Sequence, residues 1–287
     1  MKINGTAYRT IWLNDDGWSV EIIDQTKLPH ELVTARLATM EDAAVAIRTM
    51  QVRGAPLIGA TAAYGVCLAL REDTSDEAMD AAIAHLAEQR PTAVNLRWAL
   101  EEIRKAIRNL PREERVAAAY RQAATLCDED IEACRMIGIH GLRLIEEIAA
   151  KKELGDPVNV LTHCNAGWIA CVDWGTATSP IYQAHDKGIA MHVWVDETRP
   201  RNQGASLTAY ELGAHGVPHT IVVDNHLYGV EIHHLAGFYR QFLDAEPLSL
   251  RHLILFTTGF NYCVHCNLQP YLVAIRRNAL SADRTAR

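Results

Sequence analysis

Hydrophobic and polar residues alternate along the first part of the chain in the pattern of paired strands. Residues 7–13 and 18–23 alternate, and the segment 14–17 (Asn-Asp-Asp-Gly) supplies turn residues between them, which predicts a β-hairpin. The period becomes helical from Thr39, which precedes acidic residues and an apolar run in a capping arrangement. Further amphipathic stretches predict helices at about 57–71, 76–89, 92–108 and 112–150.

The second half has a different pattern, in which short apolar runs are separated by helical stretches. The runs cover residues 158–163, 191–196 and 220–224, with helices expected near 176–187 and 204–214. Strands that are apolar on both faces and alternate with helices indicate a parallel sheet. We therefore predict an α/β fold: a small mixed α/β N-terminal domain (1–125), then a Rossmann-like parallel-sheet domain (126–225) that is truncated or altered at its C-terminal end.

The composition changes abruptly after Asn225. All four phenylalanines lie beyond this residue, whereas all six tryptophans, all six methionines and every lysine precede it. Beyond it, only residues 253–257 form a convincing strand-like run. We therefore predict that residues 226–287 are a divergent tail, an out-of-frame or otherwise foreign replacement.

The charge distribution argues against some classes of partner. The net charge is −7 at pH 7 and the charges are interspersed, so no basic stripe indicates a nucleic-acid or anionic-membrane partner. The apolar runs are far shorter than the roughly 20 residues that span a bilayer. The N-terminal residues lead directly into polar sequence, without a signal-peptide core. We expect a cytoplasmic protein.

The seven cysteines do not resemble a disulfide framework, because they are odd in number and scattered through a long chain. Most are expected to be buried thiols. Cys263 and Cys266 form a lone C-x-x-C without a second pair at zinc-ribbon spacing, so we expect no metal site there.

Cys164 is the first candidate for chemistry. It follows the predicted strand 158–163 and begins a polar, glycine-containing loop, and ligands of open parallel sheets bind beyond the carboxyl ends of the strands. If this loop leads into a helix N-terminus, the helix dipole would favour the thiolate. Cys164 is therefore either an acid/base or nucleophile, or a buried cysteine at a strand end. His163 should point to the opposite side of the strand.

The next strand, 191–196, also ends in a polar loop. Residues 197–205 (Glu-Thr-Arg-Pro-Arg-Asn-Gln-Gly-Ala) supply acidic, cationic and amide groups, and Gly204 allows close approach of a ligand to the backbone. The alternative is a set of solvated charges in which Asp196 and Glu197 pair with Arg199 and Arg201.

Two arginines in the first half are candidates for phosphate binding. Arg53 and Gly54 lie just before a helix that can begin at Pro56, and a helix N-terminus beside a guanidinium can bind an anion. Arg90 precedes a second probable helix. Arg97 lies inside that helix and is expected to be structural or solvent-facing. Neither a Walker loop nor a G-x-G-x-x-G fingerprint is present.

Together these segments resemble the methylthioribose-1-phosphate isomerase family, which is related to the regulatory subunits of eukaryotic translation initiation factor 2B. The matching strings are VRGAP at 52–56, RPTAVNL at 90–96, THCNAG at 162–167 and WVDETRPRNQGASLTAYEL at 194–212. The resemblance runs from about residue 7 to residue 225. It implies a homodimer that acts on a sugar phosphate between two domains, without a metal or organic cofactor.

The resemblance also implies roles for individual residues. Arg53, Gly54 and Ala55 would bind substrate, Arg90 and Gln203 would also contact it, and Cys164 would be the catalytic thiol. The implied reaction converts S-methyl-5-thio-α-D-ribose 1-phosphate to S-methyl-5-thio-D-ribulose 1-phosphate in methionine salvage.

The sequence departs from the family in its last part. The family's second catalytic group is an aspartate in a Gly-Thr-Asp-Arg motif, followed by an Asn-Lys pair, and neither occurs in this sequence. We therefore expect little or no turnover, unless Asp196 or Asp224 supplies the missing acid. The alternatives are an isomerase of another 1-phosphorylated pentose and a non-catalytic regulator that binds a phosphate ligand.

Overall fold

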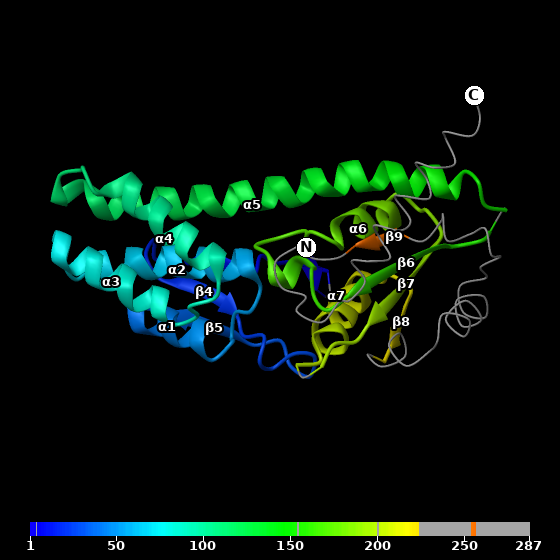
Figure 1. Cartoon of the computed structure of the whole chain (residues 1–287), viewed down its shortest axis with the longest axis horizontal. Helices are drawn as coiled ribbons and strands as arrows, with labels where there is room; N and C mark the ends of the chain where they lie inside the picture. Colours follow the sequence, from blue (N-terminus) through cyan, green and yellow to red (C-terminus); the bar gives the residue numbers. More distant parts are fainter. Residues whose placement is uncertain (4, 154, 200, 224–253, 257–287) are drawn as a thin grey trace, which may run out of the picture. The chain divides into compact units, whose positions relative to one another are not determined.

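The N-terminal strands form two small antiparallel sheets in the computed structural model, which describes residues 1–3, 5–153, 155–199, 201–223 and 254–256 (Figure 1). One sheet pairs β1 (Lys2–Ile3) with β2 (Thr6–Ala7), and the other has the order β3 (Ile11–Leu13), β4 (Val20–Ile23), β5 (Thr34–Leu37). The predicted hairpin is confirmed by the β3–β4 pair. Gly17 in its turn has φ +76° and donates its N–H to the Asn14 carbonyl at 2.9 Å.

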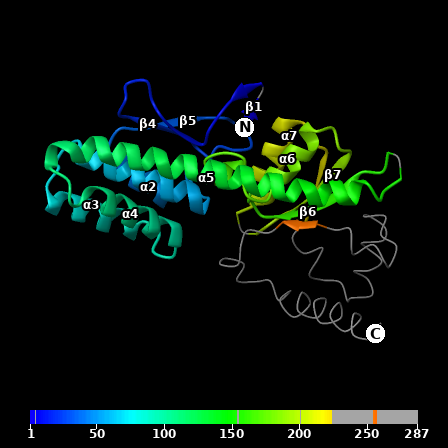
Figure 2. The same cartoon turned by 90° about the horizontal axis from the view of Figure 1, so that it is seen from above.

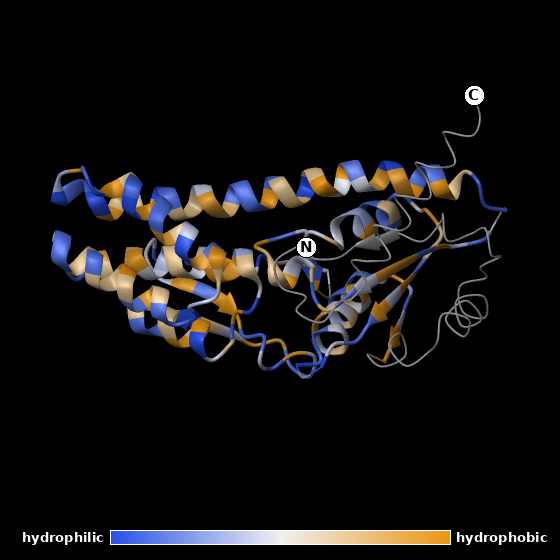
Figure 3. Ribbon diagram, viewed as in Figure 1, coloured by the Kyte–Doolittle hydropathy of each residue, from blue (hydrophilic) through white to orange (hydrophobic). Residues whose placement is uncertain are grey.

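Five helices follow: α1 (Met40–Arg48), α2 (Ala55–Leu70), α3 (Asp76–Glu88), α4 (Val94–Ile107) and α5 (Arg112–Ala149). The predicted cap at Thr39 is present: its hydroxyl accepts the Asp42 N–H at 3.1 Å, and the Asp42 carboxylate accepts the Thr39 N–H at 2.8 Å. Helix α2 is apolar on nearly all sides, because it packs against α1, α3, α4 and α5 (Figures 2 and 3).

The second half contains the predicted parallel sheet, in the order β8-β7-β6-β9. Its strands are β6 (Val158–His163), β7 (Met191–Asp196), β8 (His219–Val222) and β9 (Ile254–Phe256). Helix α6 (Ser179–Asp186) connects β6 to β7, and α7 (Ala209–His215) connects β7 to β8. Because the strands are added in one direction, right-handed connections place both helices on one face of the sheet, as Figure 2 shows. The α/β fold with a Rossmann-like parallel sheet is confirmed.

Two hydrophobic cores meet along α5. Its first part, including Ala119 and Leu126, packs with α2 and α4, and its last part, including Ile145, packs with β6, β7 and α6. The boundary predicted near residue 125 falls within this continuous helix, and the division into domains stays a prediction.

Some predictions concern residues outside those described. These include the lone Cys263/Cys266 motif, Asp224 and most of the divergent tail at 226–287. Within the tail, β9 forms part of the strand-like run predicted at 253–257, and it pairs in parallel with β6. No helix among the described residues is long and apolar enough to cross a membrane.

Candidate active site

Cys164 lies at the carboxyl edge of the parallel sheet. The last residues of β6 and β7, His163 and Asp196, pair in register, and Cys164 follows immediately. Its φ of +61° places it in the left-handed region, which residues other than glycine adopt rarely and often at functional sites. The Cys164 N–H donates to the Asp196 carbonyl at 3.3 Å, and the Thr208 hydroxyl donates to the Cys164 carbonyl at 2.6 Å. The cysteine backbone is thus fixed from both sides.

The Cys164 thiol contacts a second predicted residue. Its S–H donates to Gln203 Oε1 at 2.9 Å, although the two residues are 39 positions apart in the sequence. Gln203 immediately precedes the π-helical turn η2 (Gly204–Thr208), a form of helix that occurs mostly as short segments and often at functional sites. The structure therefore brings together the loops that follow β6 and β7.

Arg53 interacts electrostatically with Cys164. Its side chain is half-buried, and its Nη2 donates to the Gln25 carbonyl at 2.8 Å, while its buried Nε has no hydrogen-bond partner among the described residues. Burial and then the charge of Arg201 lower the pKa of Arg53, whereas interaction with Cys164 raises it. The guanidinium is thus near enough to Cys164 to interact with a developing thiolate.

Helix α2 begins directly after Arg53. Gly54 is its N-cap and provides no side-chain cap, and Ala55 at the first helical position is exposed. A Cβ atom on Gly54 would lie 1.8 Å from the carbonyl oxygen of Ala170, so only glycine fits between α2 and the 3₁₀ turn η1 (Trp168–Ala170). The N-terminus of α2 therefore packs against the segment that follows the Cys164 loop.

Arg90 is also near Arg53. Its Nη1 donates to the Arg53 carbonyl at 3.4 Å, which brings together two of the predicted phosphate-binding residues from the ends of different helices. Arg97 is exposed on α4, in agreement with the expectation that it is structural or solvent-facing. The six predicted site residues thus lie on four segments connected by these contacts, and their roles stay predictions; they are Arg53, Gly54, Ala55, Arg90, Cys164 and Gln203.

The loop after Cys164 does not lead into an α-helix. It leads into η1, a 3₁₀ turn of three residues, so the condition under which a helix dipole would favour the thiolate is not met. The Gly167 region instead folds over the buried Glu211 side chain.

The polar residues at the ends of the strands have partners other than Cys164. His163 Nδ1 lies 2.6 Å from Asp196 Oδ2, so His163 and Cys164 are directed to different groups, as their alternation on the strand predicted. Glu197 accepts the N–H groups of Thr198 and Ala205, each at 2.6 Å. Glu197 therefore fixes the loop that carries Gln203.

The other described cysteines differ from Cys164 in burial. Cys67, Cys127, Cys134 and Cys171 are buried, whereas Cys164 is half-buried. Burial raises the pKa of Cys127 to about 12. Among the described residues, Cys134 and Cys171 with Asp130 bring three donor atoms within 4.8 Å of one another, and this group does not include Cys164.

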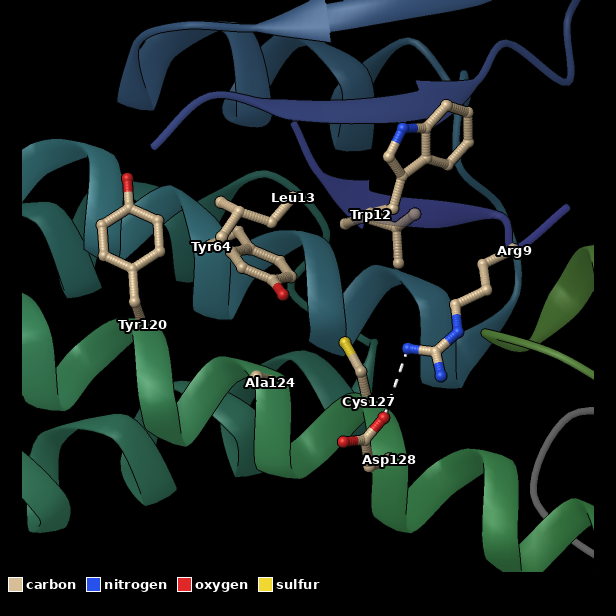
Figure 4. Close-up of a pocket in the computed structure, with 9 residues that line it drawn as sticks. Arg9, Trp12, Leu13, Tyr64, Tyr120, Ala124, Cys127 and Asp128 are labelled. Atoms are coloured by element: carbon tan, nitrogen blue, oxygen red, sulfur yellow. Dashed lines mark hydrogen bonds and ion pairs between the residues drawn. The ribbon is translucent and has the colours of Figure 1, made fainter. Parts of the chain in front are cut away.

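A pocket of about 400 Å³ lies in the N-terminal half (Figure 4). It is lined by Arg9, Ile11, Trp12, Leu13, Tyr64, Tyr120, Ala124, Cys127 and Asp128. The Arg9 guanidinium pairs with Asp128 at 3.2 Å, and the Tyr120 hydroxyl donates to the Trp18 carbonyl at 2.6 Å. None of the residues predicted for the active site lines this pocket.

Sequence reasoning missed two residues that support the Cys164 loop. Thr208 bonds to the Cys164 carbonyl, and Glu211 is fully buried against Gly167. Both lie in the matching string at 194–212, but within its helical pattern they are indistinguishable from ordinary helix residues. Only the burial of a carboxyl group identifies Glu211.

Comparison with known proteins agrees with this geometry. The model of the initiation factor 2 subunit family matches residues 51–230. A methylthioribose-1-phosphate isomerase from Methylorubrum populi is 61% identical over 225 residues, which cover 78% of this chain and 61% of that protein. The chain thus spans about three fifths of the length of this relative.

Two solved structures have a similar fold. The 5-methylthioribose 1-phosphate isomerase from Pyrococcus horikoshii superposes with a TM-score of 0.70 at 32% identity, over 89% of this chain and 68% of that one. The delta subunit of translation initiation factor eIF-2B from A. fulgidus superposes with a TM-score of 0.69 at 36% identity, over 87% and 68%. The chain therefore belongs to the initiation factor 2 subunit family and, within it, is similar to the methylthioribose-1-phosphate isomerases, as its motifs predicted.

Proposed function

We propose that the chain is an aldose–ketose isomerase that converts S-methyl-5-thio-α-D-ribose 1-phosphate to S-methyl-5-thio-D-ribulose 1-phosphate. The observation that carries the proposal is the contact of Cys164 with Gln203 at 2.9 Å, at the carboxyl edge of the sheet and beside Arg53. The names of the relatives support the choice of substrate. In this role the protein is a cytoplasmic homodimer of methionine salvage that needs no metal or organic cofactor.

The substrate sets the chemical problem. Its anomeric oxygen carries phosphate, so the sugar cannot simply open to a free aldehyde. The enzyme must assist ring opening and move a hydrogen from C2 to C1, which oxidises C2 to a ketone and reduces C1 while the phosphate is retained. Cys164 is the acid/base group for this transfer, and general acid/base groups typically contribute about 10²–10⁴-fold each.

The phosphate is held by Arg53, Arg90 and backbone N–H groups at the start of α2. Support comes from the Arg90–Arg53 contact at 3.4 Å and from the lack of a side-chain cap at Gly54, which leaves the first N–H groups of α2 available. Gln203 holds the Cys164 thiol from the other side and would also contact the sugar.

The test is turnover by the purified 287-residue chain, with 5-deoxyribose 1-phosphate and ribose 1,5-bisphosphate as competing substrates. We expect slow conversion with the methylthio sugar preferred, because the family's second catalytic aspartate is absent, and we expect Cys164→Ser to abolish it. Turnover comparable to that of a full-length relative would show that another acid replaces the missing aspartate. Preference for another 1-phosphorylated pentose would keep the reaction class and change the substrate.

A second candidate function is a regulator that binds a phosphate ligand without turnover. The observation that favours it is that neither Gly-Thr-Asp-Arg nor the following Asn-Lys occurs in the 287 residues. Asp196, one candidate for the missing acid, bonds to His163 at 2.6 Å. Saturable binding of a sugar 1-phosphate without conversion would favour the regulator.

A further inference from the structure

Glu211 is a buried acidic residue that the proposed mechanism does not use. It lies on α7, its side chain is fully buried, and none of the residues matched to the family's substrate contacts includes it. An acidic side chain is seldom fully buried unless it is bonded or neutral, so its surroundings indicate what it does.

The Glu211 carboxyl group contacts the loop that begins with Cys164. Its Oε2 accepts the Ile169 N–H at 3.2 Å. Its Oε1 faces the Cα atom of Gly167: a Cβ atom at that position would lie 1.3 Å from Oε1, so residue 167 must be glycine for the loop to close over the carboxyl group. Glu211 therefore supports the end of the loop that is distant from Cys164.

The same chain segment holds the start of the loop. The Thr208 hydroxyl donates to the Cys164 carbonyl at 2.6 Å, and the Asn165 amide donates to Thr208 Oγ1 at 3.1 Å. Gln203, at the beginning of this segment, accepts the Cys164 S–H. The segment from residue 203 to residue 211 thus contacts the thiol, the loop backbone next to it and the far end of the loop.

Burial favours the neutral form of this carboxyl group. Burial raises the pKa of Glu211 to about 8, and hydrogen bonds from the Ile169 N–H and from neighbouring side chains only partly oppose this effect. Tyr182 on α6 and Cys171 after η1 also interact with Glu211, and burial holds the pKa of Tyr182 well above its usual value. The pKa of Cys171 is also raised, and the largest cause is its hydrogen bond with Cys134. Tyr182 and Cys171 therefore do not titrate near pH 8. Other charged or titratable groups face the same neighbours: Asp173 interacts with Tyr182 and pairs with the N-terminal ammonium of Met1, Asp130 interacts with Cys171, and the His215 ring lies 4.8 Å from that of Tyr182.

We propose that Glu211 is a positioning residue for Cys164: its carboxyl group, through Gly167 and Ile169, holds closed the loop that presents the thiol. The name "positioning residue" rests on the proposed function, because it treats Cys164 as the reacting group. The effect on the thiol does not depend on turnover. Ionisation of Glu211 would place an uncompensated charge beneath the loop and weaken the closed state.

The experiment measures alkylation of Cys164 by iodoacetamide, quantified on its own peptide by mass spectrometry between pH 6 and pH 9.5. In the wild-type chain we expect the rate to rise with thiol ionisation and to rise further near pH 8, where Glu211 ionises and the loop loosens. In Glu211→Gln, which keeps an acceptor for the Ile169 N–H and cannot ionise, we expect the first rise without the second.

Glu211→Ala removes the acceptor altogether. We expect its Cys164 to be alkylated about tenfold faster at pH 7, because an unsatisfied buried N–H destabilises the closed loop. Thr208→Val, which is nearly the same shape, removes the other anchor and should act in the same direction. Ile103→Ala, in the buried face of α4, is the matched control for general destabilisation and should leave the rate unchanged.

Two results would overturn the proposal. One is a folded Glu211→Ala chain with the wild-type rate. The other is a Glu211→Gln chain with the wild-type pH profile, and this comparison remains decisive if Glu211→Ala does not fold. Absence of isomerase turnover in the wild-type chain would contradict the proposed function and leave these thiol measurements valid.

Discussion

The helical half and the sheet half of the chain bury different kinds of side chain. From α1 to α5, the buried polar side chains among the described residues are Thr61 and Arg115. From β6 to α7 they are Thr162, Thr178, Ser179, Asp196, Glu197, Thr208 and Glu211. Burying a polar group costs free energy unless the group is hydrogen-bonded. The buried polar side chains from β6 to α7 therefore mark the region where the placement of particular groups has been favoured over the stability of the fold.

The bonds of these polar groups show the same contrast. Thr61 donates to the Leu57 carbonyl of its own helix, and Arg115 joins helix ends by donating to the Thr74 and Arg108 carbonyls. Thr208 and Glu211, in contrast, bond to a loop that crosses the end of the sheet. The polar groups of the first region thus bond within or between helices, whereas Thr208 and Glu211 hold the loop that begins at Cys164.

The largest effect should come from removing that thiol. Cys164→Ala is expected to lower kcat by about 10²–10⁴-fold, the usual contribution of an acid/base group. Cys127→Ala, which removes a buried thiol from the helical half, should leave kcat unchanged in the folded fraction. Steady-state kinetics on both variants checks the difference, and equal losses would remove the functional distinction between the two halves.

Ile103→Ala tests the helical half as a purely structural core. Ile103 is fully buried in α4, so the variant should lose about 2–5 kcal/mol of unfolding free energy in urea titrations. Labelling of Cys164 in the folded protein should not change. A change in labelling would mean that the helical core also positions the thiol.

Glu211 should make stability depend on pH in the opposite sense to an ordinary paired carboxylate. Its pKa is about 8 in the folded protein against an ordinary value of 4.5, so the folded chain holds the extra proton between these values. The free energy of unfolding should therefore fall as pH rises through this window, by up to about 1.4 kcal/mol per pH unit, and then level off. In Glu211→Gln this decline should be absent, which denaturant titrations at pH 5, 6.5 and 8 would measure. Parallel curves for the two proteins would show that Glu211 is ionised when buried.

The smallest expected effect is on ligand affinity. Arg53→Ala and Arg90→Ala should each weaken binding of a sugar 1-phosphate by about ten- to 150-fold, which corresponds to about 1.5–3 kcal/mol for a charge-assisted bond. Arg97→Ala, which removes an exposed arginine from α4, is the matched control. Calorimetric titration distinguishes them, and wild-type affinity in both site variants would place the phosphate elsewhere.

The sequence predicted the elements well because each has a local signal. The capping residues at Thr39 and the period of the following stretches placed the helices within a few residues, and the apolar runs placed β6 and β7 at their observed bounds. Because β6 and β7 were predicted as parallel strands, their carboxyl ends should lie at the same edge of the sheet. The closeness of the loops that follow these two strands was therefore also predictable.

The support beneath the site was not predictable, because it depends on long-range contacts. Nothing local distinguishes Glu211 from a solvent-facing helix residue, and its contact with Gly167 spans 44 positions. Nor does the pattern after Cys164 show that the chain forms a three-residue turn there and no α-helix N-terminus. The sequence suggests Asp196 as a partner for an arginine or as a substitute acid, whereas its bond to His163 depends on the register of β6 with β7.

The continuous helix α5 has a consequence for how the chain unfolds. With 38 residues it is about 57 Å long, and its two ends contribute to different cores. Melting either core would expose one end of the helix to water, and a bare helical end is weakly stable on its own because helix formation is cooperative. The two cores are therefore thermodynamically linked, and calorimetry should record their unfolding as one transition in which the calorimetric and van't Hoff enthalpies agree.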